Sequence, residues 1–310
     1  MREFAVSNDL IGDDAALDVV WERDGYWFFR DVIDREAVER LRAVYIEVLV
    51  DLGFVDPGSG TAVWNGANME NFPVFRIPEL IRRAGWRDFI GAAPVAGFFS
   101  RILGEPGFWL PMIEQRAQPR QEEIVPFLFV HQDGFFYNGA IPCRTCWFPL
   151  DAVDATMGGL AVAAGLHRRP FLHDASKPPA YDLDLAKIPD DAWRYSEMAA
   201  GDVIVFDERT PHTGLPNYSD RFRLSLDMRV MRYSDSRPAI GPILAVSSDS
   251  ITIEAGGIVT FPIDDATYIR TNESGLMLNR AEIERHYAVG DEAIVAVRDG
   301  RATFIRPPSR

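Results

Sequence analysis

The chain has only two cysteines among its 310 residues, Cys143 and Cys146. They form a C-x-x-C pair in a segment, 143–150, that we expect to be a strand. Residues three apart on a strand face opposite sides and lie roughly 10 Å apart, whereas a disulfide spans at most about 7 Å between Cα atoms. A zinc site would need a second pair of ligands, which the sequence does not offer. We therefore expect free thiols, which suit a reducing cytoplasm.

Long apolar runs and an excess of basic residues are also missing. No apolar run reaches the roughly 18 residues of a membrane-spanning helix, and the N-terminus has no apolar segment of the secretory kind. The chain has 46 acidic and only 32 basic residues, which gives a formal net charge of −14. Such a surface repels phosphate backbones and anionic lipids. The sequence therefore predicts a cytoplasmic protein without nucleic-acid or membrane partners.

Hydrophobic residues make up 47% of the chain and aromatic residues 12%. This composition supplies one large core, with or without a small appendage, and argues against disorder. The N-terminal third predicts a short strand at 26–30 and a helix at 35–52, with Asp34 as its N-cap and apolar residues at helical spacing. A second helical region is predicted over 77–102.

From about residue 108 the pattern changes to short apolar runs bounded by Gly, Pro, Asp and Asn. We expect strands at 108–113, 127–130, 145–150, 159–163, 202–206 and 222–231. Strands spaced in this way, without helices between them, predict an antiparallel sandwich or barrel. A joint is expected at 234–242, so that a domain of residues 1–240 precedes a small β-rich appendage of residues 241–310. Asp299-Gly300 between two apolar runs predicts a hairpin in this tail.

The strongest chemical signal is His131-Gln132-Asp133, which follows the apolar run 127–130. Residues i and i+2 of an extended chain point to the same face, so an imidazole and a carboxylate would share one side. An H-x-D pair also arises by chance, so it does not establish a metal site alone. His212, after the apolar run 202–206, is the candidate third ligand. Two histidines and one carboxylate leave open positions on iron(II) and are typical of its oxygenases.

The residues around His212 resemble the phytanoyl-CoA dioxygenase family of iron(II)- and 2-oxoglutarate-dependent oxygenases. The family shows H-x-D, then a distal His that is followed by Gly, by Asn, by Ser or Thr, and by an Arg eleven positions on. In this sequence His212, Asn217, Ser219 and Arg223 fit this register. The segment 158–167 resembles the family's G-x-L-x-V-x-P-G-S-H, but has Ala for Pro and Leu for Ser. The resemblance covers roughly residues 15–235 and excludes the tail. It implies a mainly β fold, a double-stranded β-helix (jelly roll) with flanking α-helices, and it implies iron(II) and 2-oxoglutarate as cofactors.

The resemblance also implies where the cosubstrate binds. Arg223 would pair with the far carboxylate of 2-oxoglutarate through its planar guanidinium. Arg221 shares the parity of Arg223 and is the alternative. Ser225 lies on the same face as Arg223 and is expected to add a hydrogen bond. Trp147 resembles a family tryptophan that lines the cosubstrate pocket, with Thr145 on the same face; core packing is the alternative role of Trp147.

The remaining candidates concern the substrate and the other histidines. We expect Phe135, Phe136 and Tyr137 to cover an apolar substrate, with ordinary core packing as the alternative. The acidic insert 171–200 is a candidate lid. His167 and His173 are expected to be structural, and they are the replacements if His212 is not a ligand.

Basic residues are only scattered, which disfavours a CoA thioester and favours a small-molecule or natural-product substrate, oxidised with O2. Two alternatives to the oxygenase remain open at this point. One is a metal-dependent isomerase or epimerase of the same fold, for which Arg223 has no purpose. The other is a non-catalytic binding protein, against which the intact His-Asp-His set argues.

Overall fold

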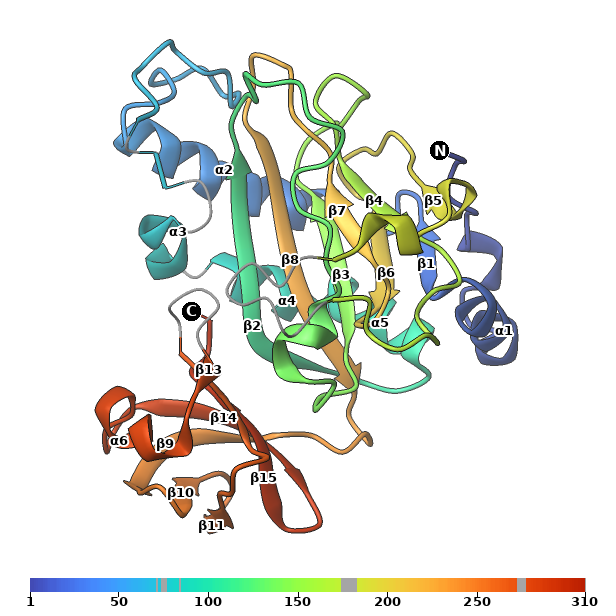
Figure 1. Ribbon diagram of the computed structural model, residues 1–310. Coiled ribbons are helices and arrows are strands. Elements are labelled where there is room, and N and C mark those ends of the chain that lie inside the picture. The colour runs from blue at the N-terminus through green and yellow to red at the C-terminus, as the bar shows by residue number, and fades with distance from the viewer. Residues whose placement is uncertain (71, 74–76, 84, 174–182, 272–276, 310) are drawn as a thin grey trace.

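The computed structural model describes residues 1–70, 72–73, 77–83, 85–173, 183–271 and 277–309 (Figure 1). The N-terminal third supplies most of the helices and the first strand: η1 (Asn8–Leu10), α1 (Asp14–Asp24), β1 (Tyr26–Phe29), α2 (Arg35–Asp51), α3 (Pro78–Arg83), α4 (Gly85–Gly91) and α5 (Ala93–Leu103). The predicted helix at 35–52 is confirmed as α2. Its N-cap Asp34 accepts a hydrogen bond from the Ala37 backbone N–H at 2.9 Å.

The central part of the chain forms two antiparallel sheets. Its elements are β2 (Gly107–Gln118), η2 (Asp133–Tyr137), β3 (Arg144–Pro149), β4 (Leu160–Ala163), η3 (Leu185–Lys187), η4 (Asp190–Ala192), β5 (Trp193–Arg194), β6 (Val203–Asp207), β7 (His212–Gly214) and β8 (Arg223–Arg232). One sheet has the order β1-β6-β3-β8-β2 and the other β5-β4-β7. This mainly β, jelly-roll arrangement confirms the predicted fold class.

Strand alternation gives the five-stranded sheet two different faces. On β8, Leu224, Leu226, Met228 and Val230 pack with α2, α4 and α5 in the largest hydrophobic core. The residues between them, 223, 225, 227 and 229, face the other way and line a cavity that β4 and β7 close from the opposite side. The helices therefore cover one face of the sheet (Figure 1) and leave the other for chemistry.

One predicted strand is wrong. Residues 127–130 are an irregular segment that runs beside β7 and makes only a few of the bonds of a β ladder. Leu128 N–H donates to the Gly214 carbonyl at 3.0 Å, but Phe129 N–H donates to the Thr213 hydroxyl at 3.3 Å. The side-chain acceptor replaces a backbone acceptor, and this interrupts the regular pairing.

The tail forms a separate seven-stranded sheet with the order β11-β10-β9-β14-β15-β12-β13. Its elements are β9 (Ala239–Val246), β10 (Ser250–Glu254), β11 (Ile258–Pro262), β12 (Tyr268–Arg270), β13 (Met277–Leu278), η5 (Arg280–Glu282), α6 (Ile283–His286), β14 (Glu292–Arg298) and β15 (Arg301–Arg306). The predicted hairpin is confirmed: Asp299 and Gly300 have φ of 52° and 76°, as a type I′ turn requires.

This C-terminal sheet has a hydrophobic core of its own, and it also packs against the jelly roll. Its own core includes Ile243, Ile251, Ile253 and Ile305. A further apolar cluster joins Ile294, Ala296 and Phe304 of the sheet to Leu110, Tyr137 and Met231 of the jelly roll.

In the described part of the chain, no helix combines the length and apolar composition needed to cross a membrane.

Gly25 provides a test of how the N-terminal segment is fitted to the jelly roll. It ends α1 with φ of 74°, and a Cβ on it would lie 2.4 Å from His167 Nδ1 and 2.9 Å from Thr210 Oγ1. Gly12 also has a positive φ of 93°, but a Cβ there would meet nothing within 4 Å. Overpacking costs about 1–3 kcal/mol beyond the backbone strain that both sites share.

We therefore expect Gly25→Ala to lower the free energy of unfolding by about 1–3 kcal/mol more than Gly12→Ala does. Urea denaturation of the two variants measures this difference. Equal destabilisation of both variants would contradict the tight fit of Gly25 against the His167 ring.

Candidate metal centre

A pair of backbone hydrogen bonds brings the two candidate histidines together. His131 N–H donates to the His212 carbonyl at 3.0 Å, and His212 N–H donates back to the His131 carbonyl at 2.9 Å. His212 begins β7, and His131 lies in the irregular segment beside it. The two imidazole rings consequently have centroids only 4.2 Å apart.

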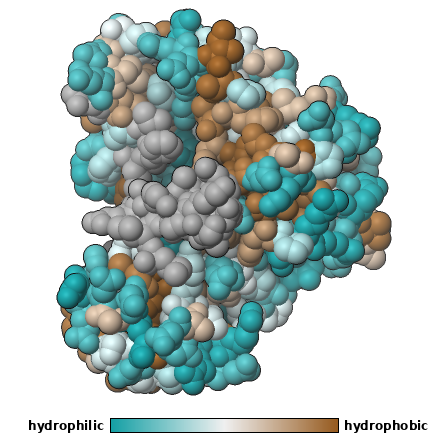
Figure 2. Space-filling view, viewed as in Figure 1, coloured by the Kyte–Doolittle hydropathy of each residue, from teal (hydrophilic) through white to brown (hydrophobic). Residues whose placement is uncertain are grey.

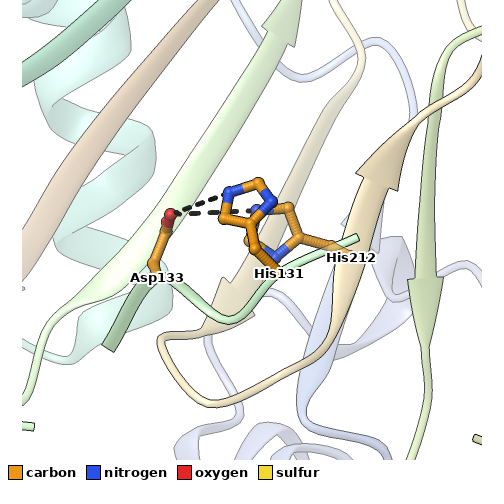
Figure 3. A group of neighbouring side chains, drawn as sticks. All are labelled: His131, Asp133 and His212. Carbon is orange, nitrogen blue, oxygen red and sulfur yellow. Dashed lines mark ion pairs between the residues drawn. The ribbon is translucent and has the colours of Figure 1, made fainter. Parts of the chain in front are cut away.

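Asp133 completes the set from the first residue of η2 (Figure 3). Its Oδ1 lies 3.4 Å from His131 Nε2 and 3.8 Å from His212 Nε2. One ligand atom from each residue falls within 4.8 Å of the other two. Since iron bonds to nitrogen and oxygen are roughly 2 Å long, as for zinc, one ion fits among these atoms.

Each histidine is oriented by a backbone carbonyl. His131 Nδ1 lies 3.2 Å from the Phe129 carbonyl oxygen, and His212 Nδ1 lies 3.0 Å from that of Thr210. Donation from Nδ1–H to these oxygens leaves each Nε2 as the metal-binding atom. Burial, aided by the nearby His131, lowers the pKa of His212 to about 3, so this imidazole is neutral, as a metal ligand must be.

The second oxygen of Asp133 is held by two donors from the five-stranded sheet. Thr145 Oγ1 donates to Asp133 Oδ2 at 2.6 Å, and Arg229 Nη2 donates to the same atom at 2.8 Å. Burial favours the neutral acid, but the Arg229 guanidinium outweighs it and holds the pKa of Asp133 well below its usual range. The carboxylate is thus kept ionised, with Oδ1 facing the histidines.

A cavity of about 330 Å³ opens in front of these three side chains. It is lined by Glu114, Arg116, Gln118, Leu128, Phe129, His131, Asp133, Phe136, Trp147, Gly159, Leu160, His212, Gly214, Arg223, Ser225, Asp227, Arg229 and Arg270. A larger hollow of about 490 Å³ lies between residues 64–70, 72, 119–122 and 220–222, and none of the three side chains lines it. We place the chemistry in the smaller cavity because the ligand set is there.

Arg223 is a buried cation without a carboxylate partner among the described residues. Its side chain is only 4% exposed, and Nη1 donates to the Leu215 carbonyl at 2.7 Å and the Gly159 carbonyl at 3.3 Å. Burial lowers the pKa of Arg223 to about 10. An unpaired buried charge is costly, so the position is suited to an anionic ligand that enters the cavity.

The structure separates Arg223 from its alternative, Arg221. Arg221 lines the larger hollow and lies 3.8 Å from Asp151 Oδ2. Ser225 and Trp147 line the cavity, as expected for residues near the cosubstrate. Thr145, predicted beside Trp147 at the cosubstrate, instead donates to Asp133.

Only one of the three aromatic residues predicted to meet the substrate lines the cavity, namely Phe136. Phe135 stacks on His173 with ring centroids 4.2 Å apart. Tyr137 is buried, and its hydroxyl lies 3.2 Å from Cys143 Sγ. These positions follow from η2, because a 3₁₀ turn distributes successive side chains in different directions, whereas the prediction was a loop with all three rings over the substrate.

Gln132, between the two ligands, connects the site to its surroundings. It is fully buried; its side-chain amide donates to the Arg209 carbonyl at 2.6 Å and its Oε1 accepts from Leu172 N–H at 2.7 Å. Its backbone N–H donates to His173 Nε2 at 2.9 Å, so His173 is a structural partner of the metal-binding segment.

The other predicted elements have clear positions. His167 is buried against Gly25, away from the cavity lining. Cys143 and Cys146 are buried and free, as predicted. The insert 171–200 was predicted to be a lid, but its residues 174–182 lie outside the described part. Within the remainder, Leu183, Ile188 and Trp193 pack in a core with β4.

Arg229 is the functional residue that sequence reasoning missed. Residues 223, 225, 227 and 229 share one face of β8, so the parity that selected Ser225 also indicated Arg229. What the sequence did not reveal is that this arginine meets the Asp133 carboxylate.

Comparison with known proteins agrees with this geometry. The phytanoyl-CoA dioxygenase family model matches residues 21–225. Two curated relatives, both named 1-deoxypentalenic acid 11-beta-hydroxylase, are each 26% identical. The one from Streptomyces exfoliatus aligns over 76% of this chain and 88% of its own, and the one from Streptomyces arenae over 76% and 87%.

Two solved structures share the fold. One is the epimerase SnoN in complex with Fe3+, alpha ketoglutarate and nogalamycin RO, with a TM-score of 0.50, 21% identity and coverage of 70% of this chain and 84% of that one. The other is the alpha ketoglutarate dependent carbocyclase SnoK from nogalamycin biosynthesis, with a TM-score of 0.50, 21% identity and coverage of 76% and 88%.

Arg229→Met tests the support of Asp133. Without the guanidinium, the buried carboxylate keeps only the Thr145 donor, its pKa rises, and protons compete with the metal at higher pH. We expect iron(II) affinity to fall about ten- to a hundredfold, with a loss that grows as the pH is lowered. Competition with a chelator at pH 6 and pH 8 measures it.

Arg232→Met is the matched control, because Arg232 lies on the same strand but bonds to the Leu103 carbonyl and lies outside the cavity lining. Iron affinity of Arg229→Met equal to that of Arg232→Met would show that the Arg229 bond to Asp133 does not support the metal.

The buried carboxyl group of Glu208 is expected to make the stability of the protein depend on pH. This residue lies behind η2, its backbone carbonyl accepts from Gly134 N–H at 2.8 Å, and burial raises the pKa of its carboxyl to about 8. The folded protein holds this proton between the ordinary glutamate pKa of 4.5 and about 8, whereas the unfolded chain has lost it. Stability therefore falls as the pH rises through this window.

We expect Glu208→Gln to remove the fall in stability that the Glu208 carboxyl causes as the pH rises. The stability of the variant relative to wild type should therefore be greater at pH 8 than at pH 5. Melting temperatures at both pH values measure this gain, and Glu3→Gln, at an exposed glutamate, is the control. Parallel profiles for wild type and Glu208→Gln would contradict the prediction.

Proposed function

This chain belongs to the phytanoyl-CoA dioxygenase family, and on that premise we propose that His131, Asp133 and His212 are its iron ligands. The protein is an enzyme, a non-haem iron(II)- and 2-oxoglutarate-dependent dioxygenase that oxidises a small molecule with O2. The observation that carries the assignment of residues is the convergence of two Nε2 atoms and one carboxylate oxygen within 4.8 Å at the wall of a cavity.

The donor set fits iron(II). Two neutral imidazoles and one ionised carboxylate occupy one side of the ion and leave positions for 2-oxoglutarate and dioxygen. Iron(II) held there would activate dioxygen, which is the oxidant, with 2-oxoglutarate as the co-reductant that supplies two of its four electrons. The chain's own contribution is to keep Asp133 charged through Arg229 and to fix both imidazoles through backbone carbonyls.

We propose that Arg223 binds the far carboxylate of 2-oxoglutarate. The guanidinium is buried in the cavity without an acidic partner, and Ser225 lies on the same face of β8. A dicarboxylate that reaches from the metal to Arg223 would neutralise this charge. A metal-dependent isomerase would need no buried arginine to bind a cosubstrate. A 2-oxoglutarate-dependent oxygenase does need one, and this favours the oxygenase.

We propose hydroxylation of a natural product with an apolar skeleton. The two curated relatives are named as hydroxylases. Leu128, Phe129, Phe136 and Leu160 give the cavity an apolar wall. Apolar side chains also gather on the surface over β7 (Figure 2). Phe129, in the segment beside β7, is 46% exposed, and Ile124, which precedes that segment, is 94% exposed. An apolar entrance suits an apolar substrate.

Two further points remain proposals. A cytoplasmic location is supported by the two buried thiols, which form no disulfide. A division into an oxygenase domain of residues 1–240 and an appendage of residues 241–310 is supported by the separate sheet and core of the tail.

Anaerobic titration with iron(II) and 2-oxoglutarate tests the function. We expect the weak visible charge-transfer band of the complex in the wild type. Arg223→Ala should bind iron normally but need roughly ten- to a hundredfold more 2-oxoglutarate, because charge-assisted hydrogen bonds to the carboxylate are lost. Arg223→Lys should recover part of this, since an ammonium cannot present the planar fork.

Arg221→Ala is the control and should behave as the wild type, since Arg221 faces the other hollow. A defect in Arg221→Ala without one in Arg223→Ala would reverse the assignment. No band in the wild type would contradict the proposed function itself.

A further inference from the structure

The iron cavity has a wall of polar side chains to which the proposed function assigns no role. On β2, which runs beside β8 (Figure 1), every second residue from 114 to 118 lines the cavity: Glu114, Arg116 and Gln118. Earlier on the same face of β2, Leu110 and Met112 belong to the apolar cluster that joins the C-terminal sheet. This face of the strand therefore changes from apolar to polar where the cavity begins.

Asp227 of β8 continues the polar wall. It lies directly opposite Glu114 in the strand register and also lines the cavity. Its Oδ2 accepts a hydrogen bond from Arg116 Nε at 3.3 Å, whereas its Oδ1 has no hydrogen-bond partner among the described residues. The side chain of Asp227 is only 13% exposed, against 31% for Glu114. One oxygen thus positions the carboxylate, and the other is left to accept a hydrogen bond from a ligand.

Donor groups lie next to this acceptor. Arg116 bonds to Asp227 through Nε, but its Nη2 lies 3.8 Å from Glu114, which is longer than a hydrogen bond. Within the described part of the chain, the side-chain amide of Gln118 makes no hydrogen bond, and only the backbone carbonyl of this residue accepts one, from Asn217 at 3.0 Å. A ligand group that both donates and accepts hydrogen bonds would therefore satisfy this wall.

A neutral hydroxyl group has both capacities. A carboxylate can only accept and would face the like charge of Asp227, and an ammonium group can only donate and would face Arg116. The cavity also has apolar lining residues, among them Leu128, Phe129 and Leu160. Together the two kinds of lining match an apolar skeleton that carries a hydroxyl group.

We propose that Asp227 determines specificity by accepting a hydrogen bond from a hydroxyl group of the substrate, so that the enzyme oxidises an apolar skeleton that already carries an alcohol. This inference rests on the proposed function and names its substrate class. Arg116 has two tasks in this arrangement: it positions Asp227 through Nε, and its remaining N–H groups donate to the oxygen of the same hydroxyl.

The test compares alcohols with their ketones, which accept hydrogen bonds but cannot donate them. Cyclohexanol, 2-adamantanol and 2-decalol are titrated calorimetrically, each against its ketone, into the full-length protein with iron(II) and 2-oxoglutarate under anaerobic conditions. Burial raises the pKa of Asp227, so the titrations are done at pH 8 to keep the carboxyl ionised.

We expect at least one alcohol to bind wild type about tenfold more tightly than its ketone, the effect of one hydrogen bond to a carboxylate. Asp227→Asn should lower this ratio to about threefold or less, because a neutral amide oxygen accepts a weaker hydrogen bond. Iron and 2-oxoglutarate affinities should not change in this variant.

Asp18→Asn is the matched control, because the Asp18 carboxylate also pairs with an arginine, Arg232 at 3.8 Å, but lies outside the cavity lining. It should keep the full preference for the alcohol. Equal loss of alcohol and ketone binding in Asp227→Asn, or loss of iron or 2-oxoglutarate affinity, would make Asp227 a structural support of the cavity and overturn the proposal.

Cyclohexylamine and cyclohexanecarboxylate distinguish a hydroxyl site from an ion site. If either ion binds wild type more tightly than cyclohexanol, and this advantage is lost in Asp227→Asn, the wall recognises a charged group and the proposal is wrong. It is also wrong if none of the three alcohols binds wild type more tightly than its ketone, whether both bind or neither does.

The comparison needs no turnover, so its failure is separable from that of the proposed function. If the protein takes up iron and 2-oxoglutarate but shows no preference for an alcohol, only the role of Asp227 is wrong. If 2-oxoglutarate does not bind, the proposed function is wrong, and the alcohol preference is then measured with iron(II) alone.

Discussion

The ionised carboxylate of Asp133 is the group on which the rest of the site depends. It is buried, and a buried charge is stable only if its surroundings compensate for it. The chain divides the task between two oxygens: Oδ2 is held by Thr145 and Arg229, and Oδ1 faces the two imidazoles. Because the sheet satisfies one oxygen completely, the other is left directed at the metal position.

That arrangement links the metal site to the folding of β8. Alternate residues of this strand are apolar and pack under the helices, and those between them carry the polar groups of the cavity. A shift of one residue in the register of β8 would bury Arg223 and Arg229 against the helices and expose the core residues. The hydrophobic core therefore fixes which side chains of β8 face the cavity.

The sequence was informative where local rules decide the outcome. The Asp34 cap, the Asp299-Gly300 turn and the alternation of β8 are short-range features, and each predicted its element correctly. The sequence was not enough where a partner distant in sequence decides. Parity placed Thr145 on the face of Trp147 but could not reveal Asp133 as its hydrogen-bond partner. Residues 127–130 have a strand-like composition, but the predicted strand is wrong because a threonine hydroxyl of β7 interrupts its pairing.

The same reasoning explains why the sequence did not reveal that the tail contacts the jelly roll. Nothing in the alternating strands of residues 251–261 or in the hairpin indicates a neighbour in the jelly roll, because the joining cluster of Ile294, Ala296 and Phe304 has the composition of any small core. Only the packing of that cluster brings β12 to η2 and Arg270 to Phe136. The cavity therefore has walls from both the jelly roll and the C-terminal sheet. The jelly roll carries the three candidate metal ligands, and the appended sheet contacts η2 at its other end, through Phe136 and Tyr137.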